Sequence, residues 1–323
     1  MRTPMEKASV LITGGAGFIG SHLADAVLAA GAREVVVVDN LFLGEPSNLD
    51  GALDRGAVFY RDDCEFATSL EYIFELHDID VVFNCATKAL NYSFLNPSQA
   101  FSTNVTVVLN LLELQRRGAF RTLAHFSTSE VYGTAEYEPM DEAHPRNPTT
   151  AYAGGKLAAD IAVETYVRMF GLDAFILRPF NNYGPRQNCR GQLAGVIPVT
   201  VARILAGLQP EIHGDGTQKR DFIHVHDTVA CTLALYGVMS PGASVNVASG
   251  VSIDIAALVT KVCDHLGYGG GVARKPARGS DVACHAASNE RLGELIDHRF
   301  IPFEEGLAQT VDWYRDYLSR SGC

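Results

Sequence analysis

The sequence predicts an α/β protein built on a doubly wound parallel sheet, with a smaller lobe formed by its C-terminal third. Short apolar runs alternate with helix-like stretches over residues 1–180. Most runs have the length of buried strands, and turn or polar residues follow them. Such alternation indicates parallel strands covered by helices on both faces. With 323 residues and 47% hydrophobic residues, the chain can bury a large core.

The expected elements follow one another with short connections. We expect strands at residues 8–13, 34–38, 57–60, 81–84, 122–127 and 174–177, and helices at 21–30, 67–77, 97–117 and 150–170. The regular alternation ends after Arg178. There we expect strands at 222–225 and 245–248, and helices at 195–206, 226–238, 253–265 and 303–318.

Composition and charge argue against some classes of binding partner. Lys and Arg total 26 against 37 Asp and Glu, a net charge of -11 without a basic block, which argues against nucleic acid or an anionic membrane as partner. The seven cysteines are scattered singly, without the close pairs of zinc sites or redox dithiols. No leader segment and no apolar run of about 20 residues is recognisable, so we expect a cytoplasmic protein.

A glycine-rich turn joins the first strand to the first helix. Gly14, Gly17 and Gly20 allow a tight turn, close approach of a pyrophosphate to the backbone, and close helix packing. The amides at the start of the following helix would receive the phosphates. Asp39 ends the next strand, where an acid binds ribose hydroxyls in Rossmann-type domains. Its carboxylate would repel a 2′-phosphate and no arginine follows directly, so we expect NAD.

Tyr152 and Lys156 are four residues apart and share one face of an expected helix. A neighbouring ammonium can lower the pKa of a phenol by favouring its charged form. A phenol activated in this way can take a hydroxyl proton while hydride leaves the adjacent carbon. This pair is therefore the candidate for the chemical step.

The ordered series of motifs resembles the extended branch of the short-chain dehydrogenase/reductase family, which includes NAD-dependent nucleotide-sugar epimerases, dehydratases and decarboxylases. The resemblance covers nearly the whole chain. It rests on residues 14–20, 39–41, 62–63, 84–87, 103–105, 127–133, 152–156, 178–186, 214–220 and 304–307.

This resemblance implies transient oxidation of the sugar at C4 to a 4-keto intermediate. It makes Tyr152 the base, Lys156 the residue that holds the nicotinamide ribose, and Thr128 a hydrogen-bond partner of the reacting hydroxyl. The positions implied for NAD are Gly14, Gly17, Phe18, Ile19, Gly20, Asp39, Asn40, Asp62, Asp63, Ala86, Lys88, Asn104 and Phe180. Those implied for the nucleotide-diphosphate sugar are Tyr92, Asn181, Arg186, Arg220 and Arg278, the arginines being suited to a diphosphate.

The second step depends on Glu130. A glutamate next to Thr128 and Ser129 can remove the C5 proton beside a 4-ketone, so that the C6 hydroxyl leaves and a 4,6-dehydratase results. The tripeptide also resembles that of UDP-glucuronate decarboxylases, and an epimerase with a structural Glu130 is a further alternative. Ser129 differs from the aspartate that dTDP-glucose dehydratases carry there, yet it remains a candidate catalytic residue.

The chain is expected to divide into two parts. Residues 1–180 and about 218–250 would form the NAD-binding domain, and residues about 181–217 and 251–323 would form the nucleotide-sugar-binding lobe. Helices 97–117 and 150–170 resemble the pair that forms a dimer interface in this family, so we expect a homodimer. His224 and His226 alternate in an expected strand, which explains them without a metal. A non-catalytic NAD-binding sensor is the alternative from another functional class.

Overall fold

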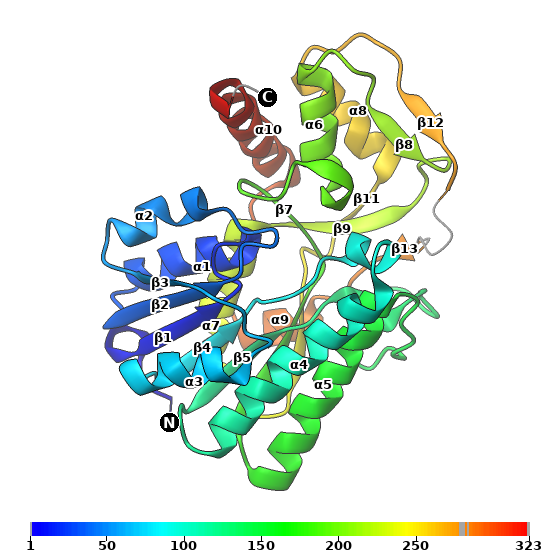
Figure 1. The fold of residues 1–323 in the computed structure, drawn as a ribbon. Helices are drawn as coiled ribbons and strands as arrows, with labels where there is room; N and C mark the ends of the chain where they lie inside the picture. The colour runs from blue at the N-terminus through cyan, green and yellow to red at the C-terminus, as the bar shows by residue number, and fades with distance from the viewer. Residues whose placement is uncertain (1, 278–281, 283, 322–323) are drawn as a thin grey trace.

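The computed structural model describes residues 2–277, 282 and 284–321. Its larger part is a seven-stranded sheet in the order β10-β6-β5-β4-β1-β2-β3, in which every pairing is parallel (Figure 1). The predicted doubly wound parallel sheet is therefore confirmed. Its strands are β1 (Ser9–Thr13), β2 (Glu34–Asp39), β3 (Val58–Arg61), β4 (Val81–Asn84), β5 (Thr122–Phe126), β6 (Asp173–Pro179) and β10 (Ser244–Val247).

Helices cover both faces of this sheet. One face packs against α1 (Phe18–Ala29), α2 (Asp50–Leu53), α7 (Val225–Val238) and α9 (Glu290–Leu295). The other packs against α3 (Ala67–Leu76), α4 (Pro97–Arg116) and α5 (Ala151–Phe170).

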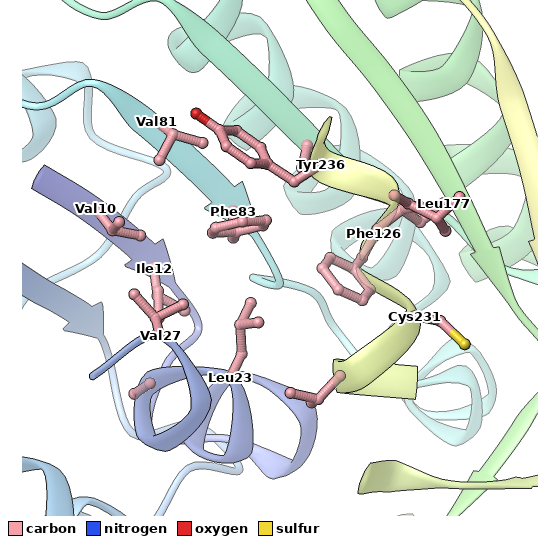
Figure 2. Close-up of a cluster of buried hydrophobic side chains, with 14 of the residues drawn as sticks. Val10, Ile12, Leu23, Val27, Val81, Phe83, Phe126, Leu177, Cys231 and Tyr236 are labelled. Atoms are coloured by element: carbon pink, nitrogen blue, oxygen red, sulfur yellow. The ribbon is translucent and has the colours of Figure 1, made fainter. Parts of the chain in front are cut away.

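Successive strand residues serve opposite cores, because side chains alternate across a strand. Val10 and Ile12 of β1 pack beneath α1 with Leu23, whereas Leu11 packs beneath the helices of the other face. Figure 2 shows the first of these clusters, in which Phe83 and Phe126 lie among side chains from α1 and α7. The continuous apolar runs of the sequence are thus explained by burial on both faces.

The C-terminal lobe contains two small sheets and three helices. β9 (Lys219–His224) lies between β11 (Ser252–Asp254) and β13 (Cys284–His285) and also pairs with β7 (Asn181–Tyr183). β8 (Glu211–His213) pairs with β12 (Ala273–Lys275). The helices are α6 (Val196–Leu205), α8 (Ile255–His265) and α10 (Phe303–Ser321), with a shared core around Tyr183, Val201, Val262 and Tyr314.

Five short 3-10 helices complete the described elements: η1 (Met5–Lys7), η2 (Pro46–Leu49), η3 (Leu90–Phe94), η4 (Ser129–Tyr132) and η5 (Gly191–Leu193). Among the described residues, no helix combines the length and apolar character needed to cross a bilayer. The same residues contain no cluster of three or more His, Cys, Asp or Glu arranged to hold a metal ion.

Residues 218–250 are divided between the large parallel sheet and the second sheet. β10 joins the large sheet and α7 packs on it, but β9 is a central strand of the second sheet. The expectation that His224 and His226 alternate in a strand is wrong, because His224 ends β9 and His226 lies in the first turn of α7. His224 caps this helix by accepting a hydrogen bond from the His226 amide.

Candidate active site

One cavity of about 1190 Å³ opens at the carboxyl ends of the parallel strands and extends to α6 and β9 of the lobe. Ligands bind at this edge in open α/β sheets. Most of the predicted site residues line it: Gly14, Gly17, Phe18, Ile19, Gly20, Asp39, Asn40, Asp62, Asp63, Ala86, Lys88, Thr128, Ser129, Glu130, Tyr152, Lys156, Phe180, Asn181, Arg186 and Arg220.

Two predicted residues lie behind this lining. The Asn104 side chain accepts hydrogen bonds from Thr87 Oγ1 at 2.8 Å and from the Lys88 amide at 3.2 Å, so it fixes the loop that forms the wall. The Tyr92 hydroxyl donates to Gln99 at 2.8 Å, and its ring packs on Phe42. Arg278 lies outside the described residues.

The glycine turn is packed too closely for side chains. Gly14 has φ +66°, and a Cβ there would lie 2.7 Å from the backbone of Ala86. A Cβ on Gly20 would overlap the Gly14 carbonyl oxygen. Gly17 precedes α1, and no side chain caps that helix, so its first residues face the cavity as a phosphate site requires.

Asp39 lies at the end of β2 with only 7% of its surface exposed. Its carboxylate accepts hydrogen bonds from the Ala16 amide at 3.0 Å and the Leu41 amide at 2.7 Å. Burial raises its pKa, and these amides act in the opposite direction. Asn40 and Asp63, joined by a 2.8 Å hydrogen bond, extend this polar wall. An acceptor-rich wall suits ribose hydroxyls and disfavours an additional phosphate, so these residues fit NAD.

Tyr152 and Lys156 project from one face of α5. The helix begins with Thr150, whose side chain accepts from the Ala153 amide at 3.2 Å, and the Tyr152 amide donates to Ser93 Oγ at 2.8 Å. A Cβ on Gly155 would lie 2.6 Å from the Phe101 backbone, so α5 packs closely on α4. The Lys156 Nζ donates to the Phe126 carbonyl at 2.7 Å.

Burial, rather than the neighbouring Lys156, is the main influence on the pKa of Tyr152 in the protein alone. Burial raises the pKa of Tyr152 to about 12, although hydrogen bonds with Thr128 and Thr87 lower it. Burial also lowers the pKa of Lys156 to about 8, and Asp160 opposes that shift. The phenol therefore stays protonated until its surroundings gain further positive charge.

Glu130 follows Thr128 in a tight turn at the end of β5. The Thr128 hydroxyl accepts from the Glu130 amide at 3.3 Å, which starts η4. The Glu130 side chain lines the cavity with 12% exposure, and its charge raises the pKa of Tyr152. A carboxyl group and the phenol thus face the same space, as the sequence predicts. Ser129 is buried beside them and also lines the cavity.

The basic residues on the lobe side differ in their surroundings. Arg220 is buried on β9, and its Nη1 donates to the Lys219 carbonyl at 2.9 Å. The Arg186 Nη1 contacts Asp25 of α1 at 2.7 Å, so its charge is already paired. Asn181 donates from its side chain to the Asp221 carbonyl at 3.2 Å.

Sequence reasoning did not identify Thr87 or His285. Thr87 is a hydrogen-bond partner of Tyr152, and it lies within a motif on which the resemblance rests. His285 Nδ1 lies 3.7 Å from Glu130 Oε1, although the two are 155 residues apart in the chain. No local pattern marks β13, a strand of two residues, so only the tertiary fold shows this contact.

The model of the NAD dependent epimerase/dehydratase family matches residues 10–248 of the chain. The chain belongs to this family. The family predicted from the motifs, the enzymatic class and NAD as cofactor are thereby confirmed.

Three relatives show how wide the family is. UDP-glucose 4-epimerase of Mycolicibacterium smegmatis is 32% identical, over 95% of this chain and 98% of the relative. UDP-glucuronic acid decarboxylase 1 of Xenopus tropicalis is 31% identical, over 97% and 73%. The structure of dTDP-glucose 4,6-dehydratase from Streptomyces venezuelae with NAD bound has a TM-score of 0.91 at 29% identity, over 97% and 98%. The sequence identities to these three relatives are nearly equal, so only the residues of the site can distinguish the three reactions.

The lowered pKa of Lys156 leads to a prediction about stability. Its pKa is about 8 in the folded protein and 10.5 when unperturbed. Between those two values the unfolded state therefore binds more protons than the folded state. The burial of Lys156 lowers the stability of the folded protein by its full amount below pH 8, and this loss disappears as the pH rises toward 10.5. Lys156→Met should raise the free energy of unfolding by about 2 kcal/mol at pH 7, after allowing for the lost Phe126 hydrogen bond.

Denaturant titrations at several pH values would measure this difference, which should shrink above pH 8. Lys7→Met changes an exposed lysine and should leave the stability near that of the unmodified protein at each pH. If the free energies of unfolding of Lys156→Met and of the unmodified protein differ by a constant amount from pH 7 to about pH 10, the lowered pKa of Lys156 is contradicted.

Proposed function

We propose that the protein is an NAD-dependent 4,6-dehydratase of a nucleotide-diphosphate sugar. The observation that supports this reaction most directly is the Glu130 carboxyl group, which faces the same cavity as Tyr152 and Thr128. Relatives of this chain include dTDP-glucose 4,6-dehydratases, for example one from Actinoplanes at 29% identity. Buried Arg220, which lines the cavity from β9 of the lobe, suits the diphosphate.

In this proposal the residues of α5 and the β5 turn handle the C4 hydroxyl. NAD, when bound, would supply the hydride acceptor for C4 and return the hydride to C6 after water has left, and a proton added at C5 would complete the 4-keto-6-deoxy product. Tyr152 takes the hydroxyl proton, and Thr128 and Thr87 hold the phenol oxygen through hydrogen bonds. A positive nicotinamide beside the phenol would favour its charged form, in the direction opposite to burial.

Glu130 then acts on the 4-keto sugar. The ketone acidifies the C5–H bond, and the Glu130 carboxylate takes this proton as the electron pair forms the C5=C6 double bond. The C6–O bond breaks, and the proton held by Glu130 converts the leaving hydroxyl to water. Ser129 has no acidic proton to donate near neutral pH, so one carboxyl group carries the proton in both steps.

Replacing Glu130 by Gln separates this reaction from its alternatives. The variant should still oxidise C4 and accumulate reduced cofactor, while loss of water falls by at least about 100-fold, since general acid–base catalysis contributes about 10²–10⁴-fold. Incubation with a panel of nucleotide sugars, followed by mass analysis, measures the product. Glu136→Gln, at an exposed position beyond the same turn, is the matched control and should leave the rate unchanged.

The masses distinguish the reactions. Loss of water supports dehydration, loss of carbon dioxide indicates decarboxylation of a uronic acid, and unchanged mass with altered stereochemistry indicates 4-epimerisation. Either of the last two outcomes with a substrate that turns over would refute the dehydratase assignment.

Tyr152→Phe tests whether the protein acts by catalysis or by NAD binding alone. Removing the phenol oxygen should lower C4 oxidation by at least about 100-fold, because the base is lost. NAD affinity, measured by calorimetry, should change by less than about threefold, since the glycine turn and Asp39 are intact. Oxidation at an unchanged rate would exclude Tyr152 as the base, whereas a sensor would bind NAD and oxidise no nucleotide sugar even in the unmodified protein.

We further propose that α4 and α5 form the interface of a homodimer. Their outer faces carry large exposed apolar residues: Phe101, Leu109, Ile161, Met169 and Phe170, with exposures of 43%, 37%, 48%, 66% and 45%. Phe101 and Leu109 of α4 are eight residues apart, as are Ile161 and Met169 of α5, so each of the two neighbouring helices presents a pair of apolar residues at helical spacing. A second copy related by a two-fold axis would cover these residues with its own.

Ile161→Arg should convert this dimer to a monomer, because it places a charge among the exposed apolar residues of α5. Sedimentation velocity at micromolar protein concentration would measure the change. Val251→Arg, at a 66% exposed apolar position in the lobe, is the matched control and should remain dimeric. A monomeric unmodified protein would refute the interface, as would a dimer that tolerates arginine at position 161.

A further inference from the structure

His285 is a completely buried histidine of the lobe that reaches the turn carrying Glu130. It is 0% exposed, and β13 pairs with β9 so that His285 lies in register with Arg220. Its Nε2 lies 3.2 Å from the Gly133 carbonyl oxygen, and its Nδ1 lies 3.7 Å from Glu130 Oε1. Nδ1 has no hydrogen-bond partner within the described structure.

The contact with Gly133 determines which nitrogen carries the proton. A carbonyl oxygen only accepts, so the Nε2 position donates and holds the hydrogen. Burial and the charge of Arg220 lower the pKa of His285 to about 4, so the ring is neutral near pH 7. A neutral ring protonated at Nε2 has a lone pair on Nδ1, and this acceptor faces the Glu130 carboxyl group.

A hydrogen-bond acceptor such as Nδ1 interacts differently with a carboxylate and with a carboxylic acid. A carboxylate has only lone pairs to present to Nδ1, whereas a carboxylic acid can donate its O–H. A hydrogen bond made only by the neutral form stabilises that form. Among the described residues, Arg220 from β9 and His144 from the loop after η4 lower the pKa of His285, and the charge of Glu130 raises the pKa of Tyr152 from α5.

We propose that His285 is a positioning residue that holds Glu130 in its protonated form between the two proton transfers. The inference rests on the proposed function, because it concerns the proton that Glu130 removes from C5. When the C5–H bond breaks, that proton binds Glu130, and the new O–H donates to Nδ1. When the C6–O bond breaks, the same proton passes from Glu130 to the departing oxygen, and His285 gains and loses none.

The arrangement also explains how one carboxyl group serves as base and then as acid. The hydrogen bond with Nδ1 orients the protonated carboxyl group and slows the loss of its proton to other acceptors. An epimerase or a decarboxylase has no second transfer to a leaving hydroxyl, and neither requires such an acceptor.

Two variants of His285 separate the acceptor from the structural contact. The terminal amide of glutamine reaches the position of Nε2, so His285→Gln keeps the bond with Gly133 and removes the acceptor at Nδ1. The amide of asparagine reaches the position of Nδ1, so His285→Asn restores an acceptor there. Both variants keep a polar side chain in the buried space, and circular dichroism verifies that each is folded.

The protonation of Glu130 is measured directly, by infrared difference spectra of the NAD-bound protein across a pH titration. The carboxylic acid band of Glu130 is identified by its absence in Glu130→Gln. In His285→Gln we expect this band to disappear at a pH about one unit lower than in the unmodified protein. In His285→Asn we expect the midpoint to return most of the way to that of the unmodified protein. In deuterated solvent, His285→Gln should lower C5 exchange about tenfold and leave C4 oxidation within about twofold.

An unchanged midpoint in folded His285→Gln would overturn the inference, as would an equal loss of C4 oxidation and C5 exchange. Because the infrared titration needs no turnover, its result is separate from the product analysis. A shifted midpoint without loss of water from any nucleotide sugar would refute the dehydratase proposal and overturn the assigned purpose of the contact.

Discussion

The buried ion pair between Asp160 and Arg178 is the interaction on which the arrangement of the site depends. Both side chains are 1% exposed or less, and Arg178 Nε and Nη2 lie 3.1 Å and 3.0 Å from Asp160 Oδ2. Arg178 Nη1 also contacts the Tyr132 hydroxyl, which donates to Asn246 at 2.7 Å. These contacts tie α5, β6, η4 and β10 together below the cavity, and removing one partner would leave a buried charge that costs about 3–5 kcal/mol.

The same pair governs the charge of the catalytic helix. Asp160 is one turn beyond Lys156, and its carboxylate opposes the burial that lowers the lysine pKa. Burial raises the pKa of Asp160, and Arg178 acts in the opposite direction. His125, 3.7 Å from Asp160, has a pKa lowered by burial and by Lys156 and Arg178, so it adds no charge near neutral pH. Lys156, with a pKa of about 8, thus retains its proton close to neutral pH although its side chain is buried.

The fold and the cavity wall could be predicted from sequence because both depend on local patterns. Asp39, Thr128 and Lys156 were found from strand ends and helix spacing, and all three line the cavity. The pKa direction of Tyr152 could not be found in this way, since it depends on burial by several separate segments. His285 could not be found either, because a two-residue strand acquires its place only through pairing with β9.

The division of the site between two sheets suggests how one framework supports several reactions. Tyr152, Lys156 and Thr128 come from α5 and the end of β5, and under the proposed function they would carry out the oxidation at C4. His285 and Arg220 come from β13 and β9 of the lobe, and His285 Nδ1 lies 3.7 Å from the carboxyl group that would act on the ketone. Changes in the lobe can therefore alter the second step without disturbing the Asp160–Arg178 pair. Glu130 lies where the two parts meet, so under the proposed function the lobe residue that faces its carboxyl group would influence the step that follows the oxidation.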